Sequence, residues 1–412
     1  MRIGIFEDSR VTDSYPLTYS RPFYDLRVGI LTLNERFAKI FRDDEISYYC
    51  RDYLSDLWQE RFPEAAVNEF SHKDTLFVNG RLVLNLWFDL PKLSNESIAF
   101  KKDDEIVAAY ITADKMDEVQ KNQNRGELQF HKFAFQKVEK VDWPILRYPW
   151  DFLQANAKQI REDLTLISDY KKVNPKDYPG VHFVNPEQIY VSENVTIKAG
   201  AVIDADEGPV YFADEAKVFH NAVIVGPCSI GRKSKISHGA KLTGNCSFGP
   251  VSNVGGEVGD TIIQGYSNKK HDGFLGGAFL GEWVNLGADT NNSDLKNNYS
   301  TVSVPLHGDP IDTGLQFAGC YVGDHTKTAI GTTINTGSVF GVGCNIFGSG
   351  FSPKFVPSFS WGGGEHIVEY KFEKMVNTAQ IVESRRDKNL TSAQIAVLKH
   401  IYEMTSSFRE AY

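Results

Sequence analysis

The stretch FADEAKVFHNAVIVGPCSIGRKSKISHGAKLTGNCSFGPVSNV, residues 212–254, decides the fold of the second half of this 412-residue chain. A large apolar side chain recurs in it at every sixth position, and a small or β-branched residue follows four positions after each. Helices repeat at about 3.6 residues and strands at about 2, so neither produces a strict period of six. A triangular solenoid does, because each six residues form one short strand, with its apolar side chain inside, and one tight corner. The apolar positions are Phe212, Val218, Ile224, Ile230, Ile236, Leu242, Phe248 and Val254, and the corner positions are Ala216, Ala222, Cys228, Ser234, Ala240, Cys246, Ser252 and Val258.

The same register predicts where the solenoid continues and where it is interrupted. It begins near Val191 and breaks at 259–279 and again at about 291–317, where we expect loops, often on the binding side. Two helices, over about 368–385 and 391–408, would cover the open end of the solenoid. The predicted domains are 1–175, an α/β domain with a connecting helix; 185–360, the solenoid; and 365–412, a helical cap.

The N-terminal half alternates strand and helix patterns. Such alternation predicts an α/β domain with a mainly parallel sheet. An amphipathic helix over 150–170 would join it to the solenoid. The expected architecture is thus an α/β N-terminal domain followed by a C-terminal left-handed hexapeptide β-helix with a helical cap. Strands are predicted at 2–6, 106–112 and 130–138, and helices at 27–41 and 52–60. Residues 75–84 are predicted to form a strand, an Asn-Gly break and a further apolar run.

Bulk composition excludes several classes of partner. A net charge of -9 argues against binding nucleic acid, because nothing offsets phosphate repulsion. No run approaches the roughly 18 apolar residues of a membrane span, and the start MRIGIFEDSR lacks a signal segment. Five cysteines without C-x-x-C spacing are typical of small buried thiols. We therefore expect a cytoplasmic protein without a nucleic-acid or membrane partner.

One polar segment interrupts the solenoid and contains a candidate catalytic residue. Residues 268–299 are dense in Asn, Gly, Asp and Lys and contain a single histidine, His271. A neutral imidazole can remove a proton from an amine that attacks a thioester. Glu257, which precedes it at the edge of the first interruption, could hold the other ring nitrogen. A surface or structural histidine is the alternative interpretation of His271.

The stretch HDGFLGGAFLGEWVNLGADT, residues 271–290, resembles a known acetyltransferase segment. It is similar to the bifunctional UDP-N-acetylglucosamine pyrophosphorylase / glucosamine-1-phosphate N-acetyltransferase family, which reads H-x-x-Y-L-G-D-A-x-I-G-x-x-V-N-I-G-A-G-T there. The longer pattern through T-N-N-S-D-L-K-N-N-Y resembles an alternative bacterial branch of that family. The matching residues are His271, Leu275, Gly276, Ala278, Gly281, Val284, Asn285, Gly287, Ala288 and Thr290.

This resemblance implies roles for individual residues. It implies that His271 is the general base and Glu257 its partner. It also implies that an Asn-Tyr pair, here Asn298 and Tyr299, contacts the sugar together with Asn285. The backbone at Gly287 and Ala288 would meet acetyl-CoA, the co-substrate.

The segment also departs from the family pattern. Phe274 replaces a Tyr, and Asp289 replaces the Gly of G-A-G-T. The basic residues that hold the sugar phosphate have no clear counterpart before His271. Lys269 and Lys270 are candidates by proximity alone.

The N-terminal half resembles the sugar-nucleotidyltransferase domain of the same alternative branch. The resemblance rests on SYPLTYSRPFYDLRVGILTLNERF, residues 14–37, and FVNGRL, residues 77–82, while the usual G-x-G-T-R-M signature is absent. Arg21 is the candidate phosphate contact, because a guanidinium binds phosphate in a fork; an ion pair between the domains is the alternative.

Two further N-terminal features are candidates for ligand contacts. Glu7 and Asp8 follow the first strand and could hold Mg²⁺, or they could simply be solvated. Asn79 and Gly80 lie where a sugar nucleotide would pass the strand ends, although a plain turn explains them equally well.

These features together predict a bifunctional enzyme. The solenoid would transfer acetyl from acetyl-CoA to glucosamine 1-phosphate, and the N-terminal domain would join the product to UTP, giving UDP-N-acetylglucosamine, with Mg²⁺ on the triphosphate. The resemblance implies a homotrimer. The alternatives are a single-activity sugar N-acetyltransferase with a non-catalytic N-terminal domain, a non-catalytic sugar-nucleotide-binding scaffold, and acetylation of a different amino sugar.

Overall fold

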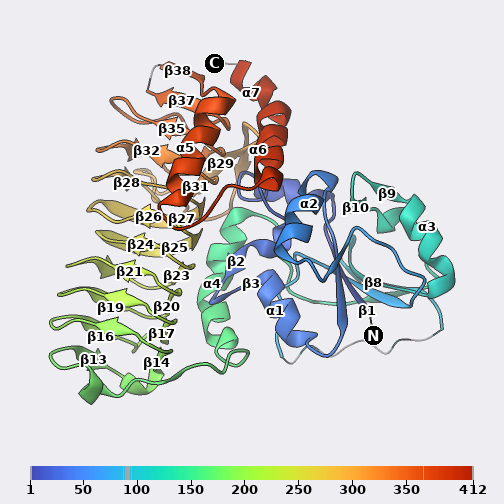
Figure 1. Cartoon of the computed structure of the whole chain (residues 1–412), viewed down its shortest axis with the longest axis horizontal. Coiled ribbons are helices and arrows are strands. Elements are labelled where there is room, and N and C mark those ends of the chain that lie inside the picture. The colour runs from blue at the N-terminus through green and yellow to red at the C-terminus, as the bar shows by residue number, and fades with distance from the viewer. Residues whose placement is uncertain (1, 87, 89–92, 94, 365, 411–412) are drawn as a thin grey trace.

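The computed structural model describes residues 2–86, 88, 93, 95–364 and 366–410. An N-terminal α/β domain lies beside a tall stack of short strands, and C-terminal helices run along the upper part of that stack (Figure 1). None of the helices in the described ranges combines the length and the apolar character that crossing a membrane requires.

The N-terminal domain is built on one seven-stranded mixed sheet. Its order is β11-β7-β8-β6-β1-β4-β5, and β8 runs antiparallel to both of its neighbours while the other pairs are parallel. The expected strand at 130–138 is wrong, because 130–132 is a 3₁₀ turn and the strand begins only at Lys137. The strands are β1 (Arg2–Phe6), β4 (Glu45–Tyr49), β5 (Ala66–Val67), β6 (Thr75–Asn79), β7 (Ile98–Lys102), β8 (Glu105–Ile111) and β11 (Lys137–Lys140).

Helices flank this sheet, and one of them starts later than the sequence predicts. The helix expected over 27–41 begins only at Leu33, where Thr32 and Glu35 form a reciprocal capping box. Before it, β2 (Arg27–Val28) and β3 (Leu31–Thr32) form a hairpin. Gly29 turns that hairpin at a φ of 79°, where a β-carbon would lie 2.5 Å from an Asp163 carboxylate oxygen. The helices are α1 (Leu33–Ile40), α2 (Asp52–Arg61), α3 (Met116–Lys121) and α4 (Pro149–Asp163).

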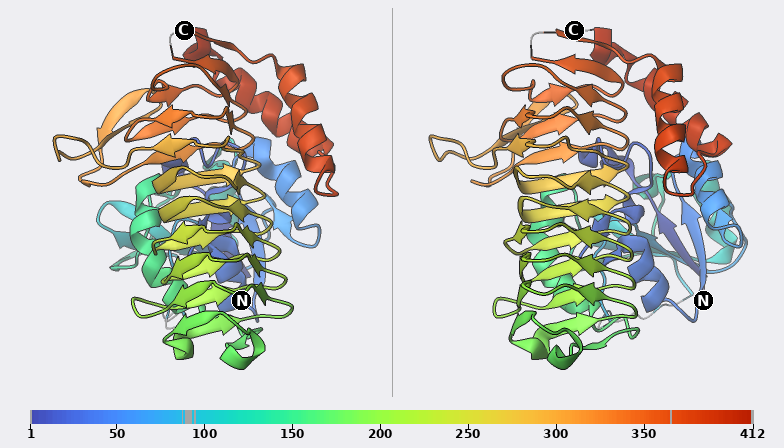
Figure 2. Two further views of the ribbon diagram at one scale, coloured as in Figure 1. Left: turned by 90° about the vertical axis from the view of Figure 1, so that its left-hand side faces the viewer. Right: turned by 60° about the vertical axis from the view of Figure 1, so that its left-hand side comes forward.

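The second half is the predicted hexapeptide solenoid. Three short strands make one coil, and each strand lies parallel to its equivalent in the preceding coil, as Phe212 lies beside Ile230. Figure 2 shows these coils stacked along one axis. The interior positions from Phe212 to Val254 are essentially fully buried, and all five cysteines are buried and free, as expected. One coil consists of β17 (Val210–Phe212), β18 (Lys217–Val218) and β19 (Val223–Val225), and the first strands of the next two coils are β20 (Cys228–Ile230) and β23 (Cys246–Phe248).

The break predicted at 259–279 is wrong, because the solenoid continues there in shorter coils. Phe248 lies beside Ile263, whereas the spacing of the regular coils would place Tyr266 there. Val258 is accordingly an interior residue beside Leu242 rather than a corner residue. Two nine-residue strands, each bent around a corner, carry the chain through: β25 (Glu257–Gly265) and β27 (Phe274–Glu282), with β26 (Asn268–Lys269) between them.

The second break is a true excursion, although it starts slightly later than expected. The strand β28 (Asn291–Asn292) still belongs to the solenoid. The chain then leaves it, forms the hairpin β29 (Ser303–Leu306) and β30 (Asp309–Asp312), and rejoins it at β31 (Cys320–Val322). Val302, Val304 and Leu306 of the excursion are buried in the core shared with the N-terminal domain.

The C-terminal helices cover the side of the last coils and also reach the N-terminal domain. Phe359 of the last coils packs against Phe372 and Tyr402, and His400 stacks on Tyr53 of α2 with ring centroids 4.2 Å apart. The free edge of the final coil is paired instead by an antiparallel strand, β38 (His366–Glu369), on β37 (Ser360–Gly363). The helices are α5 (Phe372–Ser384), α6 (Ser392–Met404) and α7 (Ser406–Glu410).

The interior register gives a first prediction. Ile236→Ala should lower the free energy of unfolding by about 2–5 kcal/mol, because it leaves a cavity at a fully buried position. Lys235→Ala, at the adjacent exposed position, should change it by no more than about 0.5 kcal/mol. Urea denaturation followed by circular dichroism measures both, and equal losses would contradict the inward and outward assignment.

Candidate active site

The candidate base His271 lies in an exposed turn between β26 and β27. The register with the preceding coil explains this exposure, because Val254 lies beside Lys269 and Glu257 beside Phe274. The four-residue turn 270–273 therefore lies above a turn of only two residues, Gly255 and Gly256. The longer turn therefore protrudes from the stack and presents its side chains to solvent.

A buried lysine fixes the start of this turn. Lys269 occupies an interior position and is 1 % exposed, and its ammonium donates to the carbonyls of Gly255, at 3.1 Å, and His271, at 2.7 Å. Burial lowers the pKa of Lys269 to about 8. The two hydrogen bonds hold the backbone of His271 on the coil below, and this leaves the imidazole free to point outward.

Glu257 is the first residue of β25, in the coil below His271. Its carboxylate is 3.7 Å from the ammonium of Lys241 and forms no ion pair with His271 among the described residues. Lys241, Glu257 and Phe274 occupy equivalent positions in three successive coils. Lys241 is a further basic residue near the candidate site, and the sequence does not reveal it because it lies one coil before Glu257 and outside the polar segment.

Asn285 belongs to a row of amides on the neighbouring face. The Asn253 amide donates to the Asn268 amide oxygen at 2.6 Å, and the Asn268 amide donates to that of Asn285 at 3.2 Å. Lys327, one coil above Asn285, continues the row. Burial lowers the pKa of Lys327 to about 8. Asn285 is exposed at this row.

The residues expected to meet acetyl-CoA lie one coil above His271. Asp289 donates its backbone N–H to the Asp272 carbonyl, and its φ of 57° explains why a glycine suits this position in similar sequences. A β-carbon on Gly287 would lie 2.5 Å from the Ala329 backbone. The Ala288 carbonyl accepts from Gly331 of the coil above.

The remaining predicted sugar contacts do not meet His271 within the chain. Asn298 and Tyr299 lie on the excursion, where the Asn298 side chain accepts from Ser300 and the Tyr299 side chain is 67 % exposed. Figure 2 shows loops of this part of the chain projecting from the stack. Lys270 is exposed in the turn next to His271.

At the strand ends of the N-terminal domain, both candidate magnesium ligands have protein partners. Glu7 is fully buried and binds the Arg51 guanidinium through both carboxylate oxygens, at 3.0 Å each. Asp8 binds Arg81, at 2.8 Å, and Asn79, at 2.7 Å. The part of the chain that the structure describes gathers no group of three potential metal-ligating side chains. Both candidate carboxylates are thus paired with an arginine in this structure.

Asn79 and Gly80 form a turn at the end of β6, which is the second interpretation that the sequence allows for them. Asn79 is fully buried, and its side chain accepts from the Arg81 backbone at 3.0 Å while donating to Asp8. Gly80 donates to the Phe6 carbonyl, and a β-carbon there would lie 2.5 Å from the Tyr24 ring. Both residues close the end of the sheet.

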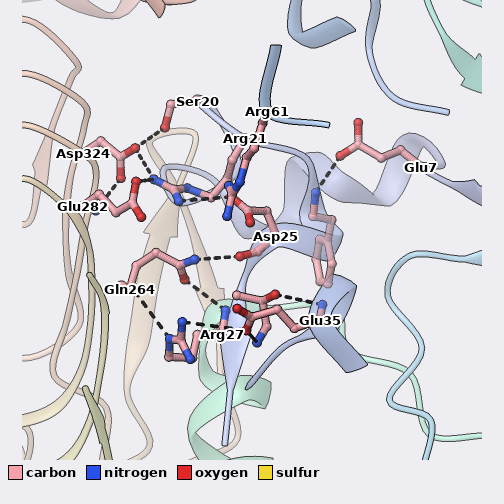
Figure 3. Close-up of polar contacts among 12 residues, drawn as sticks. Glu7, Ser20, Arg21, Asp25, Arg27, Glu35, Arg61, Gln264, Glu282 and Asp324 are labelled. Carbon is pink, nitrogen blue, oxygen red and sulfur yellow. Dashed lines mark hydrogen bonds and ion pairs between the residues drawn. The ribbon is translucent and has the colours of Figure 1, made fainter. Parts of the chain in front are cut away.

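Arg21 forms the ion pair between domains that the sequence left as its alternative. Figure 3 shows its guanidinium between the carboxylates of Asp25 in its own domain and Glu282 and Asp324 on the solenoid. Its side chain is 5 % exposed. With all its charge engaged by carboxylates, Arg21 joins the domains and does not present a free phosphate contact.

The chain is similar to known proteins over part of its length. Residues 3–172 match the sequence model of a family described as sugar nucleotidyl transferase. A bifunctional sugar-1-phosphate nucleotidylyltransferase/acetyltransferase of Sulfurisphaera tokodaii is 31 % identical over 91 residues. That match covers 22 % of this chain and 23 % of the relative's length. These matches support a transferase.

Two solved structures are also similar to this chain, at lower sequence identity. One is a Bacillus cereus protein described as an acetyltransferase, with a TM-score of 0.23 and 14 % identity over 55 % of this chain and 98 % of that one. The other is the polySia-specific acetyltransferase NeuO, with a TM-score of 0.17 and 14 % identity over 44 % of this chain and 80 % of that one.

The buried Glu7–Arg51 pair gives a second prediction. Glu7→Gln should lower the free energy of unfolding by about 3–5 kcal/mol, because it leaves a buried arginine without its carboxylate. Glu64→Gln, at an exposed position, should have little effect. Thermal and urea unfolding, with and without Mg²⁺, measure this. A Glu7→Gln protein that is as stable as the parent but has lost Mg²⁺ binding would contradict the structural role.

Proposed function

We propose that the chain is a bifunctional transferase of amino-sugar phosphates. The solenoid transfers acetyl from acetyl-CoA to the amine of glucosamine 1-phosphate, and the N-terminal domain transfers uridylyl from UTP to N-acetylglucosamine 1-phosphate. One observation carries the proposal: residues 3–172, which match the sugar nucleotidyl transferase family, dock on a hexapeptide solenoid whose protruding turn exposes His271.

His271 acts as the general base in the acetyl transfer. The amine nitrogen attacks the thioester carbonyl, the imidazole takes the proton that the amine loses, and CoA leaves as its thiolate. Glu257, in the adjacent coil, turns from Lys241 to the imidazole and stabilises its protonated form. Lys241 and Lys270 are the cations available for the sugar phosphate, and the backbone at Gly287 and Ala288 borders the thioester arm.

A second and third copy of the chain complete this site in a homotrimer. Several large apolar side chains are exposed on the excursion and the upper coils. They support an assembly, because a neighbouring copy would cover them. In the assembly, Asn298 and Tyr299 of one copy reach the sugar held at His271 of another. The exposed residues are Tyr299, Phe317, Ile330, Phe347 and Phe351. A cytoplasmic location agrees with these substrates and with the free thiols.

A single-activity acetyltransferase is the second candidate, and the N-terminal strand ends favour it. Glu7, Asp8 and Arg21 all bind oppositely charged side chains of the chain itself. Under this candidate the N-terminal domain holds the solenoid and binds a sugar nucleotide without transferring uridylyl.

The role of His271 gives the third prediction. His271→Ala should reduce acetyl transfer to glucosamine 1-phosphate about 10²- to 10⁴-fold, the usual contribution of a general base. His238→Ala is the matched control, because His238 is also exposed and lies at the same corner of a lower coil. Release of CoA thiol measures the rate. Equal activity of the two variants would rule out the assigned base.

The second reaction gives the fourth prediction. The bifunctional proposal expects pyrophosphate release from UTP and N-acetylglucosamine 1-phosphate, and His271→Ala should leave that rate unchanged because the residue belongs to the other domain. The rate of pyrophosphate release is measured as phosphate after hydrolysis by an added pyrophosphatase. Active acetyl transfer without any pyrophosphate release would favour the single-activity candidate.

A further inference from the structure

A cleft lies where the N-terminal domain, the solenoid and the C-terminal helices meet. Its volume is about 400 Å³, within the range of small-molecule sites. The N-terminal domain contributes the segment from Ser20 to Asp25 and one side of α2. The solenoid contributes three successive corner turns, and the end of α5, the following loop and the first turns of α6 form the remaining wall.

Aromatic side chains form the solenoid wall of this cleft. Tyr266, Trp283 and His325 occupy the same corner of three successive coils, each with a φ between 51° and 60°. Bulky residues rarely adopt this conformation. The ring centroids of Tyr266 and Trp283 are 4.6 Å apart in a stacked arrangement, and those of Trp283 and His325 are 6.3 Å apart with nearly parallel rings. The strained backbone is thus combined with a continuous aromatic surface inside the cleft.

The cleft also holds an excess of carboxylates. Arg21 and Arg61 face four of them: Asp25 is bound by both arginines, and Arg21 alone also binds one solenoid pair, Glu282 and Asp324. The fourth, Glu383 of α5, is 1 % exposed, and no hydrogen bond engages its Oε1 atom. A buried carboxylate oxygen without a hydrogen-bond donor is costly.

Lys388 is the cation that acts on the Glu383 carboxylate, and no described donor forms a hydrogen bond to its Oε1 atom. The Nε2 atom of His325 lies 3.9 Å from Glu383 Oε1, beyond hydrogen-bond distance, and His325 Nδ1 also lacks a partner. Burial and the nearby Lys327 lower the pKa of His325 to about 3, so its ring is neutral. Asp25 Oδ1 is a further buried atom without a hydrogen bond. Unpaired acceptors from three elements thus line one space.

We propose that this cleft binds a small organic cation with a protonated amine, whose ammonium group pairs with Glu383 and lies against Trp283. An ammonium offers three donors, which suit the carboxylate oxygen and the neutral imidazole nitrogen. The aromatic face adds a cation–π contact. The described residues provide no three-ligand metal cluster, and the acidic surplus disfavours an anion. This site is separate from the turn of His271 and goes beyond the proposed function.

Putrescine is the probe for the fifth prediction, and 1,4-butanediol is its uncharged isostere. Isothermal titration of the full chain at low salt should show binding of putrescine and none of the diol. Glu383→Gln, which removes only the charge, should weaken putrescine binding at least tenfold. Trp283→Leu should weaken it as well. Glu373→Gln, at an exposed position of the same helix, should leave it unchanged.

The pH dependence provides an independent readout. Burial, with Glu282 and Asp324 nearby, raises the pKa of Glu383 to about 7. Arg21, Arg61, Asp25, His325 and Lys388 are the other charged or titratable groups that line the same cleft, besides Glu60 at its edge. Between pH 6 and 8 the carboxylate ionises while an aliphatic amine stays protonated. Putrescine binding should therefore strengthen as pH rises, and Glu383→Gln should flatten that dependence.

Several results would overturn the proposal. These are the absence of putrescine binding at millimolar concentration, equal binding of the diol, binding of inorganic phosphate at the cleft in place of the amine, or unchanged affinity in Glu383→Gln. Thermal unfolding of each variant verifies that it is folded. The outcome does not depend on either transferase assay, so it can fail while the proposed function stands.

Discussion

The arrangement of the two halves depends on charged groups that are buried at the seam between them. Arg21 of the N-terminal domain binds Glu282 and Asp324 on the solenoid, and its side chain is only 5 % exposed. Removing such groups from water is costly, and only the partner across the seam offsets the cost. The domains are therefore held in one relative position, since any other would leave these charges unpaired.

Neutral hydrogen bonds extend the seam along the side of the solenoid. The Asn156 side-chain oxygen of α4 accepts from the Gly29 backbone of one domain and from Ser247 of the other, both at 2.8 Å. Gln264 in β25 likewise accepts from Arg27 and donates to the Asp25 carbonyl. The loop that carries Arg21 and Asp25 is thus held over the solenoid corner, and this fixes one wall of the interdomain cleft.

Periodicity was sufficient to predict the solenoid, and resemblance was sufficient for the type of N-terminal domain. Both rest on local signals: a six-residue repeat buries the same position in each coil, as Ile236 and Leu242 show. The end of that regularity was read wrongly at 259–279, because deleting corner residues keeps the strands stacked while it destroys the sequence period. Sequence spacing cannot distinguish a shortened corner from a loop that leaves the stack.

The candidate site could be predicted only where one residue type carries the chemistry. His271 is recognisable as a histidine in a polar segment, and the structure places it in an exposed turn. The partners of Glu7 and Asp8 were not predictable, because Arg51 and Arg81 are far away in sequence and meet these carboxylates only through the sheet. The sequence therefore suggests that these two carboxylates bind a ligand, whereas the fold pairs each of them with an arginine.

The irregular coils explain why the unusual side chains gather in one part of the solenoid. Where successive coils have the same length, each corner repeats the one below it, and its side chains have equivalent surroundings. The two-residue corner at Gly255–Gly256 breaks this equivalence, because the longer turn above must overhang it and Lys269 must supply an ammonium inside to hold that turn. The same coils carry Tyr266 and Trp283 at the preceding corner, which lies under the C-terminal helices. An exposed turn at His271 and an enclosed cleft at Trp283 thus lie at two different corners of these coils.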